Sequence, residues 1–281
     1  MSIRSILVQL DLRAAAPQRI EFAAELARRH EAHLVGVAAT GWLEVMSAYS
    51  EAIATTAVWD AAEASLREQA EAAVERFRQI VDRVGVPSFE SRIDDADEAS
   101  AMTLAARYCD LSVLTQTDPD EGKGAGGRST PAEVLLHSGR PVLLLPYAGT
   151  LPAQPLRRVL VGWDASREAA RALHDALPLL RQAGNVEIVV FESPVEFEHS
   201  HGDLPGADIG LWLARHGVKV LVTRQYTDMA LGESILSYAA DTGADLIVAG
   251  GYGHLRFRET VFGGVTRTLL RSSPVPVLLS H

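Results

Sequence analysis

The sequence predicts an α/β protein of two tandem domains, each an open, mostly parallel sheet of five strands with helices on both faces. Three observations predict this class. Short apolar runs of strand length alternate with amphipathic helical segments along the chain. The order of these segments occurs twice. The 281 residues, 47% of them hydrophobic, suffice for two domains with well-formed cores.

The duplication is visible in three pairs of matching segments. They are ILVQLD at 6–11 and VLVGWD at 159–164, CDLSVL at 109–114 and ADLIVA at 244–249, and RPVLLLP at 140–146 and VPVLLSH at 275–281. The aspartates that end the first pair, Asp11 and Asp164, are 153 residues apart, whereas the other two pairs are 135 apart. The second copy is therefore shorter in its middle and aligns without a gap toward its end.

Each copy then predicts the same order of elements. In the first copy these are a strand at 6–11, a helix with the apolar stripe Ile20, Ala23, Ala24 and Ala27, a strand at 33–38, a helix at 52–84, a strand at 89–93, a helix at 98–108, a strand at 109–114, a helix near Pro131 and a strand at 141–145. Pro131 follows Ser129 or Thr130 as helix cap.

The second copy repeats this order with a shorter second helix. Its elements are a strand at 159–164, a helix with the stripe Ala169, Ala172, Leu173, Ala176 and Leu180, a strand at 186–191, a helix at 207–216, a strand at 219–224, a helix at 233–242, a strand at 244–249, a helix from Gly264 and a strand at 276–279. Such alternation implies βαβ crossovers and parallel strands. The linker YAGTLPAQPL at 147–156 separates predicted domains 1–147 and 157–281.

Composition excludes several classes of partner. A net charge of −10 argues against nucleic acid or an anionic membrane surface as the main partner.

No apolar run reaches 18 residues, and the N-terminus has too short an apolar stretch for a signal peptide. Cys109 is the only cysteine, so no internal disulfide forms, and we expect it to be a small buried residue. We expect a cytoplasmic location.

A glycine-rich loop after the strand at 244–249 is the main functional candidate. Its spacing is Gly250-x2-Gly253-x9-Gly263, and Gly264–Thr266 open the next helix. Glycine allows a ligand close to the backbone, and helix N-terminal amides bind phosphate. Asp164 also follows a strand, and ligands of open α/β sheets bind outside carboxyl ends where strand order reverses. Neither a Walker A motif nor G-x-G-x-x-G is present.

In these features the chain resembles the universal stress protein family in its tandem form, with Rossmann-like domains. The resemblance covers essentially the whole chain: the strand-Asp starts, the five-strand order, the glycine loop and the closing PVPVLL strand. It implies a stress-response or signalling role and binding of ATP or a related adenine nucleotide, with or without Mg²⁺, in the C-terminal domain only. From the residues themselves we expect no catalytic residue and no protein metal site.

The resemblance also implies the residues that contact the nucleotide. Asp164, Ala249 and Gly250 would line the adenosine end. Gly253, Gly263, Gly264, Val265 and Thr266 would surround the phosphates. ATP-binding members carry Ser or Thr where this chain has Gly264, so one phosphate hydrogen bond is missing, worth roughly 0.5–1.5 kcal/mol.

The first copy lacks the loop glycines. At the 135-residue offset, Gly250, Gly253 and Gly263 correspond to Thr115, Asp118 and Arg128. We therefore predict that the first domain keeps the fold without the nucleotide.

Other interpretations stay open. The loop glycines would then only make turns, and Asp164 would only cap the next helix with Ser166. The protein would be an interaction protein without nucleotide, or an enzyme, either a slow ATPase or a relative of adenylyl-transferring proteins, whose H-x-G-H signature is absent. Three further residues of the glycine loop either contact phosphates or are simply solvated: His254, Arg256 and Arg258. For His199, His201 and Asp203 a surface loop is favoured over a metal site.

The resemblance has one further consequence. In the family, the last strands of two domains pair, which here predicts an intrachain pseudo-dimer through 141–145 and 276–279. Such pairing covers two exposed sheet edges. A further homodimer is left open.

Overall fold

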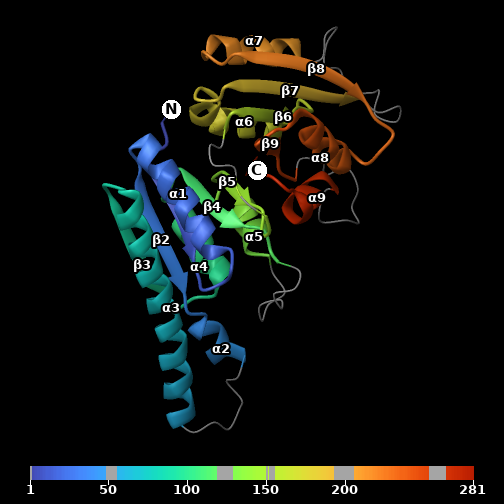
Figure 1. Cartoon of the computed structure of the whole chain (residues 1–281). Helices are drawn as coiled ribbons and strands as arrows, with labels where there is room; N and C mark the ends of the chain where they lie inside the picture. Colours follow the sequence, from blue (N-terminus) through green and yellow to red (C-terminus); the bar gives the residue numbers. More distant parts are fainter. Residues whose placement is uncertain are drawn as a thin grey trace. The chain divides into compact units, whose positions relative to one another are not determined.

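The computed structural model describes residues 2–48, 56–118, 129–149, 151, 156–192, 206–252 and 264–281. They form two compact units, Ser2–Arg140 and Pro141–His281 (Figure 1). The predicted boundary at 147 falls after a strand that the division into units groups with the second. The domain limits 1–147 and 157–281 therefore remain a prediction.

The first unit alternates strands and helices in the expected order. Its elements are β1 (Ser5–Leu10), α1 (Ala16–His30), β2 (His33–Ala39), α2 (Trp42–Ala48), α3 (Thr56–Val84), β3 (Phe89–Asp94), α4 (Glu98–Ala106), β4 (Leu111–Thr115) and α5 (Thr130–His137). Ser129 occupies the N-cap position of α5 without a capping bond from its side chain, and Pro131 lies in the first turn, as predicted. The helix α2 was not predicted, and the start of the helix expected at 52–84 lies outside the described residues before Thr56.

The second unit repeats the order. Its elements are β5 (Val142–Leu145), β6 (Arg158–Gly162), α6 (Arg167–Leu180), β7 (Asn185–Glu192), α7 (Ala207–Arg215), β8 (Val220–Tyr226), α8 (Leu231–Thr242), β9 (Leu246–Gly250), α9 (Gly264–Ser272) and β10 (Val277–Ser280). The helix α7 has 9 residues where α3 has 29, which accounts for most of the length difference between the copies.

The strand pairing confirms the predicted fold class. The strand order is β3-β2-β1-β4 in the first unit and β5-β10-β9-β6-β7-β8 in the second. The pairs within the first unit are parallel, and so are those of the second except β5 with β10. The antiparallel pair joins Val142–Leu144 to Val277–Leu279. The strands at 141–145 and 276–279 thus do pair.

The central strands are buried on both faces. All residues of β1 from Ile6 to Leu10 and four of the five in β9 are buried. A strand buried on both faces needs helices above and below it, and α1 packs on α3 while α4 packs on α5 in the first unit. Cys109 is 3% exposed, as expected of a small core residue.

A matched polar contact shows the duplication at atomic detail. Asp110, just before β4, accepts hydrogen bonds from the amides of Arg4 (2.8 Å) and Ser5 (3.0 Å) at the start of β1. Asp245, just before β9, accepts from the amides of Arg157 (2.9 Å) and Arg158 (3.1 Å) at β6. Both aspartates thus satisfy backbone donors at the entry of the central strand.

Candidate functional site

The strand order of the second unit reverses between β6 and β9. Among its parallel strands, β6 comes first in the chain, β7 and β8 follow on one side of it, and β9 lies on the other side. The strands β6 and β9 are parallel, and Val161 lies opposite Val248. Their carboxyl ends therefore lie side by side. Asp164 and the start of the glycine loop therefore leave the sheet at its switch point, where ligands of such folds bind.

Asp164 is exposed and shapes the turn that leads into α6. Its Oδ1 accepts hydrogen bonds from the amide (3.0 Å) and the hydroxyl (2.6 Å) of Ser166. Ser166 is the cap of α6, and its Oγ accepts from the amide of Ala169 at 3.1 Å. The capping interaction belongs to Ser166, and Asp164 supports it from the preceding turn.

Gly250 has a packing role. A Cβ at this position would lie 2.6 Å from the amide nitrogen of Ala169 and 2.8 Å from the carbonyl carbon of Glu168. The end of β9 therefore touches the first turn of α6 backbone to backbone, which only glycine permits. The preceding residue, Ala249, is 4% exposed, so its side chain belongs to the core.

A hydrogen bond to Thr266 joins the start of the glycine loop to the helix α9 that follows the loop. The amide of Tyr252 donates to Thr266 Oγ1 at 2.8 Å, and both residues are buried. The amide of Gly251 donates to the carbonyl of Ser280 at 2.8 Å. The start of the loop is thus bonded to both α9 and β10. Other loop residues lie outside the described residues: Gly253, Gly263, His254, Arg256 and Arg258.

Gly264 is the first residue of α9 and is exposed. A Cβ added there would meet no atom within 4 Å in the described structure. The next residue, Val265, is half-buried. The first turn of α9 therefore has room for a side chain at position 264, in contrast to position 250.

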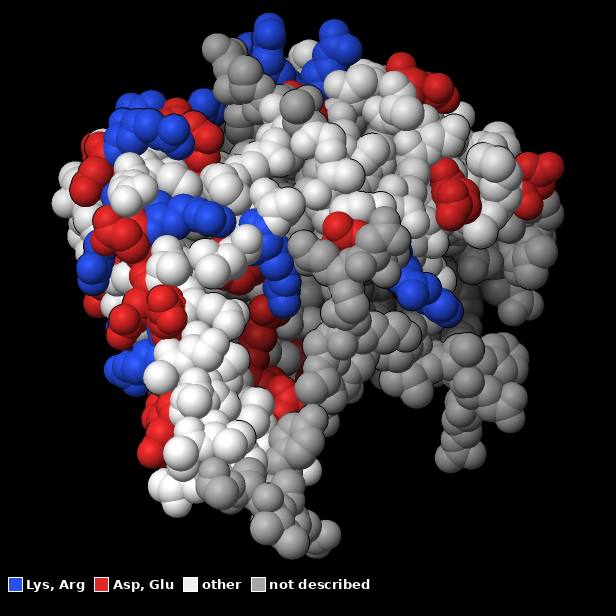
Figure 2. Space-filling view, turned by 60° about the horizontal axis from the view of Figure 1, so that its bottom comes forward, with Lys and Arg blue, Asp and Glu red and all other residues white. Residues whose placement is uncertain are grey.

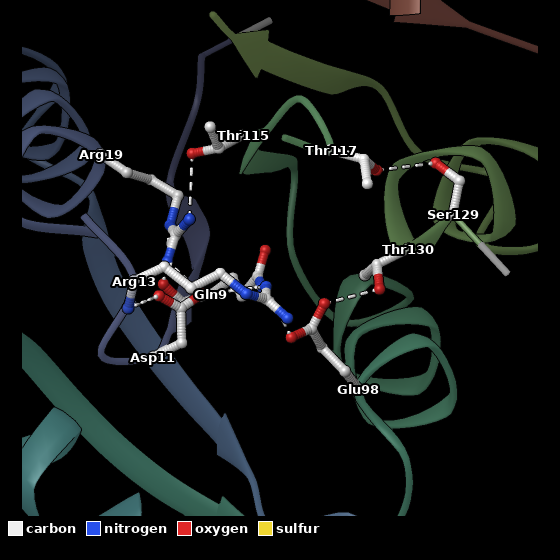
Figure 3. Close-up of polar contacts among 9 residues, drawn as sticks. All are labelled: Gln9, Asp11, Arg13, Arg19, Glu98, Thr115, Thr117, Ser129 and Thr130. Atoms are coloured by element: carbon white, nitrogen blue, oxygen red, sulfur yellow. Dashed lines mark hydrogen bonds and ion pairs between the residues drawn. The ribbon is translucent and has the colours of Figure 1, made fainter. Parts of the chain in front are cut away.

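At the corresponding place in the first unit, side chains bind one another across the ends of β1 and β4 (Figure 3). Arg19 of α1 is 2% exposed and joins three acceptors. Its Nε donates to the carbonyl of Gln9 (3.0 Å), one Nη to Thr115 Oγ1 (2.9 Å) and the other to Asp11 Oδ2 (2.8 Å). The aspartate after the first strand is thus bound by a buried guanidinium.

The polar network continues toward the next two helices. Arg13 pairs with Asp11 at 3.3 Å and with Glu98, at the start of α4, at 2.9 Å. Glu98 also accepts a hydrogen bond from Thr130 Oγ1 at 2.7 Å, at the start of α5. Side chains therefore link the carboxyl ends of the strands to the N-termini of α4 and α5 (Figure 3).

Two pairs of corresponding positions explain the difference between the units. Thr115 ends β4 and corresponds to Gly250, which ends β9. At the 153-residue offset between Asp11 and Asp164, Arg19 corresponds to Ala172, which is fully buried. Sequence reasoning missed Arg19, although a charged residue one helical turn before Ala23 falls on the buried face and would have signalled it.

No metal site is found in the part of the chain that the structure describes. It holds no group of three or more His, Cys, Asp or Glu residues placed to bind an ion, and His199, His201 and Asp203 lie outside it.

No described helix is long and apolar enough to span a bilayer. Acidic and basic side chains are interspersed on the face drawn in Figure 2.

A cavity of about 490 Å³ lies away from the candidate site. Its lining comes from the amino ends of β6, β7 and β8 and includes Arg158, Glu187 and Leu221. The carboxyl ends of the same strands carry the candidate site. We therefore place the candidate site by topology and backbone geometry.

Comparisons with known proteins identify relatives of the second half of the chain. The model of the universal stress protein family matches residues 155–281. The second half of the chain belongs to the universal stress protein family. A curated relative, universal stress protein Slr1230 of Synechocystis sp., is 41% identical over 46 residues, and the match spans 16% of each chain.

Solved structures extend the likeness to the whole chain. A universal stress protein from Archaeoglobus fulgidus has a TM-score of 0.78 at 19% identity and covers 99% of this chain and 96% of its own. This likeness shows the fold. A universal stress protein in complex with cAMP (16% identity, TM-score 0.39) covers 53% of this chain and all of its own. Another from A. fulgidus, in complex with dAMP (17%, 0.35), covers 51% and 98%.

Proposed function

We propose that this chain is a tandem universal stress protein whose C-terminal domain, 157–281, binds one ATP or related adenine nucleotide, with or without Mg²⁺. Its role is in cytoplasmic stress response or signalling. The proposed contacts are Asp164, Ala249 and Gly250 at the adenosine end, and Gly253, Gly263, Gly264, Val265 and Thr266 around the phosphates.

One observation carries the proposal: Asp164 and the glycine loop leave adjacent strands at the switch point of the sheet. The first-turn amides of α9 lie at the far end of the same loop, and the Tyr252–Thr266 bond holds the near end beside them. Such amides bind phosphate groups, aided by the partial positive charge of the helix N-terminus.

The individual contacts differ in kind. Ala249 is buried and Gly250 packs against α6, so both would act through their backbone groups. Thr266 Oγ1 already accepts the Tyr252 amide, which leaves its hydroxyl hydrogen for a phosphate oxygen. Asp164 is exposed at the carboxyl end of β6, and its carboxylate is an acceptor that suits a ribose hydroxyl.

The first domain, 1–147, is proposed to keep the fold without binding nucleotide. Arg19 neutralises Asp11 inside the protein, and Thr115 stands where the second domain has Gly250. The pairing of β5 with β10 supports an intrachain pseudo-dimer of the two domains.

The proposal is tested by titrating ATP into the purified chain and into Asp164→Ala. Loss of a hydrogen bond to a charged group corresponds to roughly 1.5–3 kcal/mol, so we expect affinity to fall about 10- to 100-fold. Ser166→Ala is the matched control, because it removes the α6 cap and the partner of Asp164 but keeps the carboxylate. Equal affinity of Asp164→Ala and the unaltered protein would remove Asp164 from the site.

A further inference from the structure

Side chains at the amino ends of β6, β7 and β8 form two rows on one face of the second sheet. Asn185 lies opposite Arg158. Lys219 precedes Val220, which lies opposite Val186. Alternate residues of a strand point to the same face, so the residues two positions further on share the face of this row. The first row is Arg158, Asn185 and Lys219, and the second is Leu160, Glu187 and Leu221; all six line the cavity of about 490 Å³.

This is the face of the sheet on which α8 lies. Tyr238 of α8 donates a hydrogen bond to Glu187 Oε1 at 2.6 Å, and Thr242, at the end of α8, also lines the cavity. The opposite face of β8 packs against α7, where a Cβ on Gly210 would lie 2.9 Å from Val222. The cavity therefore lies between the sheet and the end of α8, at the edge opposite the proposed nucleotide site.

Two cations flank the cavity without a carboxylate partner among the described residues: Arg158 and Lys219. Arg158 Nη1 donates to the carbonyl of Thr242 at 3.1 Å, which ties the guanidinium to the end of α8. Neighbouring strands lie about 4.8 Å apart, so the backbones of β6 and β8 are about 10 Å apart. Both long side chains can therefore reach an anion that lies above Asn185.

Glu187 is the only acidic residue among the described residues that line the cavity. Its Oε1 accepts hydrogen bonds from Thr223 Oγ1 and Tyr238 Oη, both at 2.6 Å. Burial, together with this carboxylate, raises the pKa of Tyr238, so the phenol keeps the proton that it donates. Two cations and one carboxylate give the lining a net charge of +1, in a chain whose net charge is −10.

The first unit has different residues at the corresponding positions. By the strand registers these are Ser5, His33 and Ser88. Ser5 Oγ donates to Asp110 Oδ2 at 3.1 Å, and His33 Nδ1 and Ser88 Oγ share a hydrogen bond of 2.7 Å. The polar groups of this row are thus satisfied within the first unit, whereas the two cations of the second unit have no anionic partner in the part of the chain that the structure describes.

We propose that this cavity binds a small organic anion, an apolar body that carries one carboxylate. The carboxylate lies between Arg158 and Lys219, with the side-chain amide of Asn185 as a third donor. The apolar body lies against Leu221, whose side chain is 62% exposed. The volume of about 490 Å³ falls in the range of small-molecule sites. The proposal does not depend on nucleotide binding.

Calorimetric titration of the full chain with carboxylates of different apolar bodies tests the proposal. The probes are hexanoate, benzoate and indole-3-acetate, and each is compared with the alcohol of the same carbon skeleton. We expect at least one carboxylate to bind saturably with a Kd of about 1 mM or below. The matching alcohol should bind about tenfold or more weakly, because it lacks the charge that the two cations recognise.

The two cations are tested one at a time. Arg158→Met and Lys219→Met each remove one charge and keep a long side chain, and we expect carboxylate affinity to fall about tenfold or more in both. Arg215→Met is the matched control, because Arg215 is exposed on α7, on the opposite face of the sheet. Its affinity for the carboxylate should stay unchanged.

Glu187→Gln gives a test that loss of folding cannot imitate. The glutamine keeps an acceptor oxygen for the two hydroxyl donors and removes the one negative charge of the lining. We therefore expect carboxylate affinity to rise about two- to fivefold. The nuclear magnetic resonance signals of the Leu221 methyl groups should shift on titration, and those of Leu104, which is 51% exposed in the first unit, should not.

Three results would overturn the proposal. The first is no saturable binding of any of the three carboxylates up to about 20 mM. The second is equal affinity for a carboxylate and its alcohol, which would make the cavity an apolar site without anion recognition. The third is carboxylate affinity that neither Arg158→Met nor Lys219→Met lowers, which would place the anion elsewhere on the chain.

Discussion

The two halves of the chain have corresponding strands, but different groups lie at the carboxyl ends of those strands. In the first, a buried arginine joins the ends of β1 and β4 through Asp11 and Thr115. In the second, the end of β9 touches α6 through the backbone of Gly250, and Asp164 stays exposed. One half satisfies its carboxylate internally, and the other leaves it at the surface.

The comparison teaches that one fold can satisfy the polar groups at its strand ends with its own side chains. A carboxylate, a carbonyl and a hydroxyl gathered at the switch point need partners once no ligand supplies them. Arg19 donates to all three. In the second half, Ala172 stands at the corresponding position and has no side-chain donor.

The largest expected effect is a loss of stability when the polar network around Arg19 in the first half is broken. Arg19→Met leaves Asp11, 15% exposed, without its buried partner, and removal of one member of a buried pair destabilises by roughly 3–5 kcal/mol. Urea unfolding, with hydrogen exchange of β1 peptides, measures the loss. Glu168→Gln is the control: its partner is solvated, so we expect about 1 kcal/mol or less. Equal losses would contradict the contrast between the halves.

The next effect concerns backbone contact in the second half. Gly250→Ala places a methyl group 2.6 Å from the Ala169 nitrogen, and such overpacking costs about 1–3 kcal/mol. Gly264→Ala is the same substitution in open space, where we expect a change within about 1 kcal/mol of zero. Thermal unfolding compares the two variants. A Gly250→Ala protein as stable as Gly264→Ala would show that β9 and α6 do not meet closely.

The smallest expected effect concerns the affinity of the second half for ATP. Gly264→Ser restores the hydroxyl that ATP-binding relatives are expected to carry, and the side chain has room. One neutral hydrogen bond of about 0.5–1.5 kcal/mol corresponds to a roughly 2- to 12-fold gain in ATP affinity by calorimetric titration. Gly264→Ala separates the hydroxyl from the added carbon. If both variants bind alike, position 264 does not face a phosphate.

Much of the fold could be predicted from the sequence because its strands are nearly continuous apolar runs and occur twice. The strand that pairs with β10 and the short α7 followed from the alignment of the copies. The helix α2 was missed: it has no buried residue, so it lacks the periodic apolar stripe that identifies helices.

The candidate site was predictable in part. Asp164 and the loop glycines stand out because strand ends and glycine spacing are local signals. The packing role of Gly250 and the bond from Tyr252 to Thr266 depend on residues distant in sequence, so spacing alone could not indicate them. Arg19 reaches Thr115 across 96 positions for the same reason.

The most direct test of the account is the number of nucleotides bound per chain. The protein is purified without added nucleotide, any released small molecule is identified by mass spectrometry, and the stripped chain is titrated with ATP. The account predicts one adenine nucleotide per chain, bound about 10- to 100-fold more weakly by Asp164→Ala and unaffected by changes at Asp118 in the first half. Two nucleotides per chain, or none at millimolar ATP, would contradict it, and the second result would favour an interaction protein that uses this fold without nucleotide.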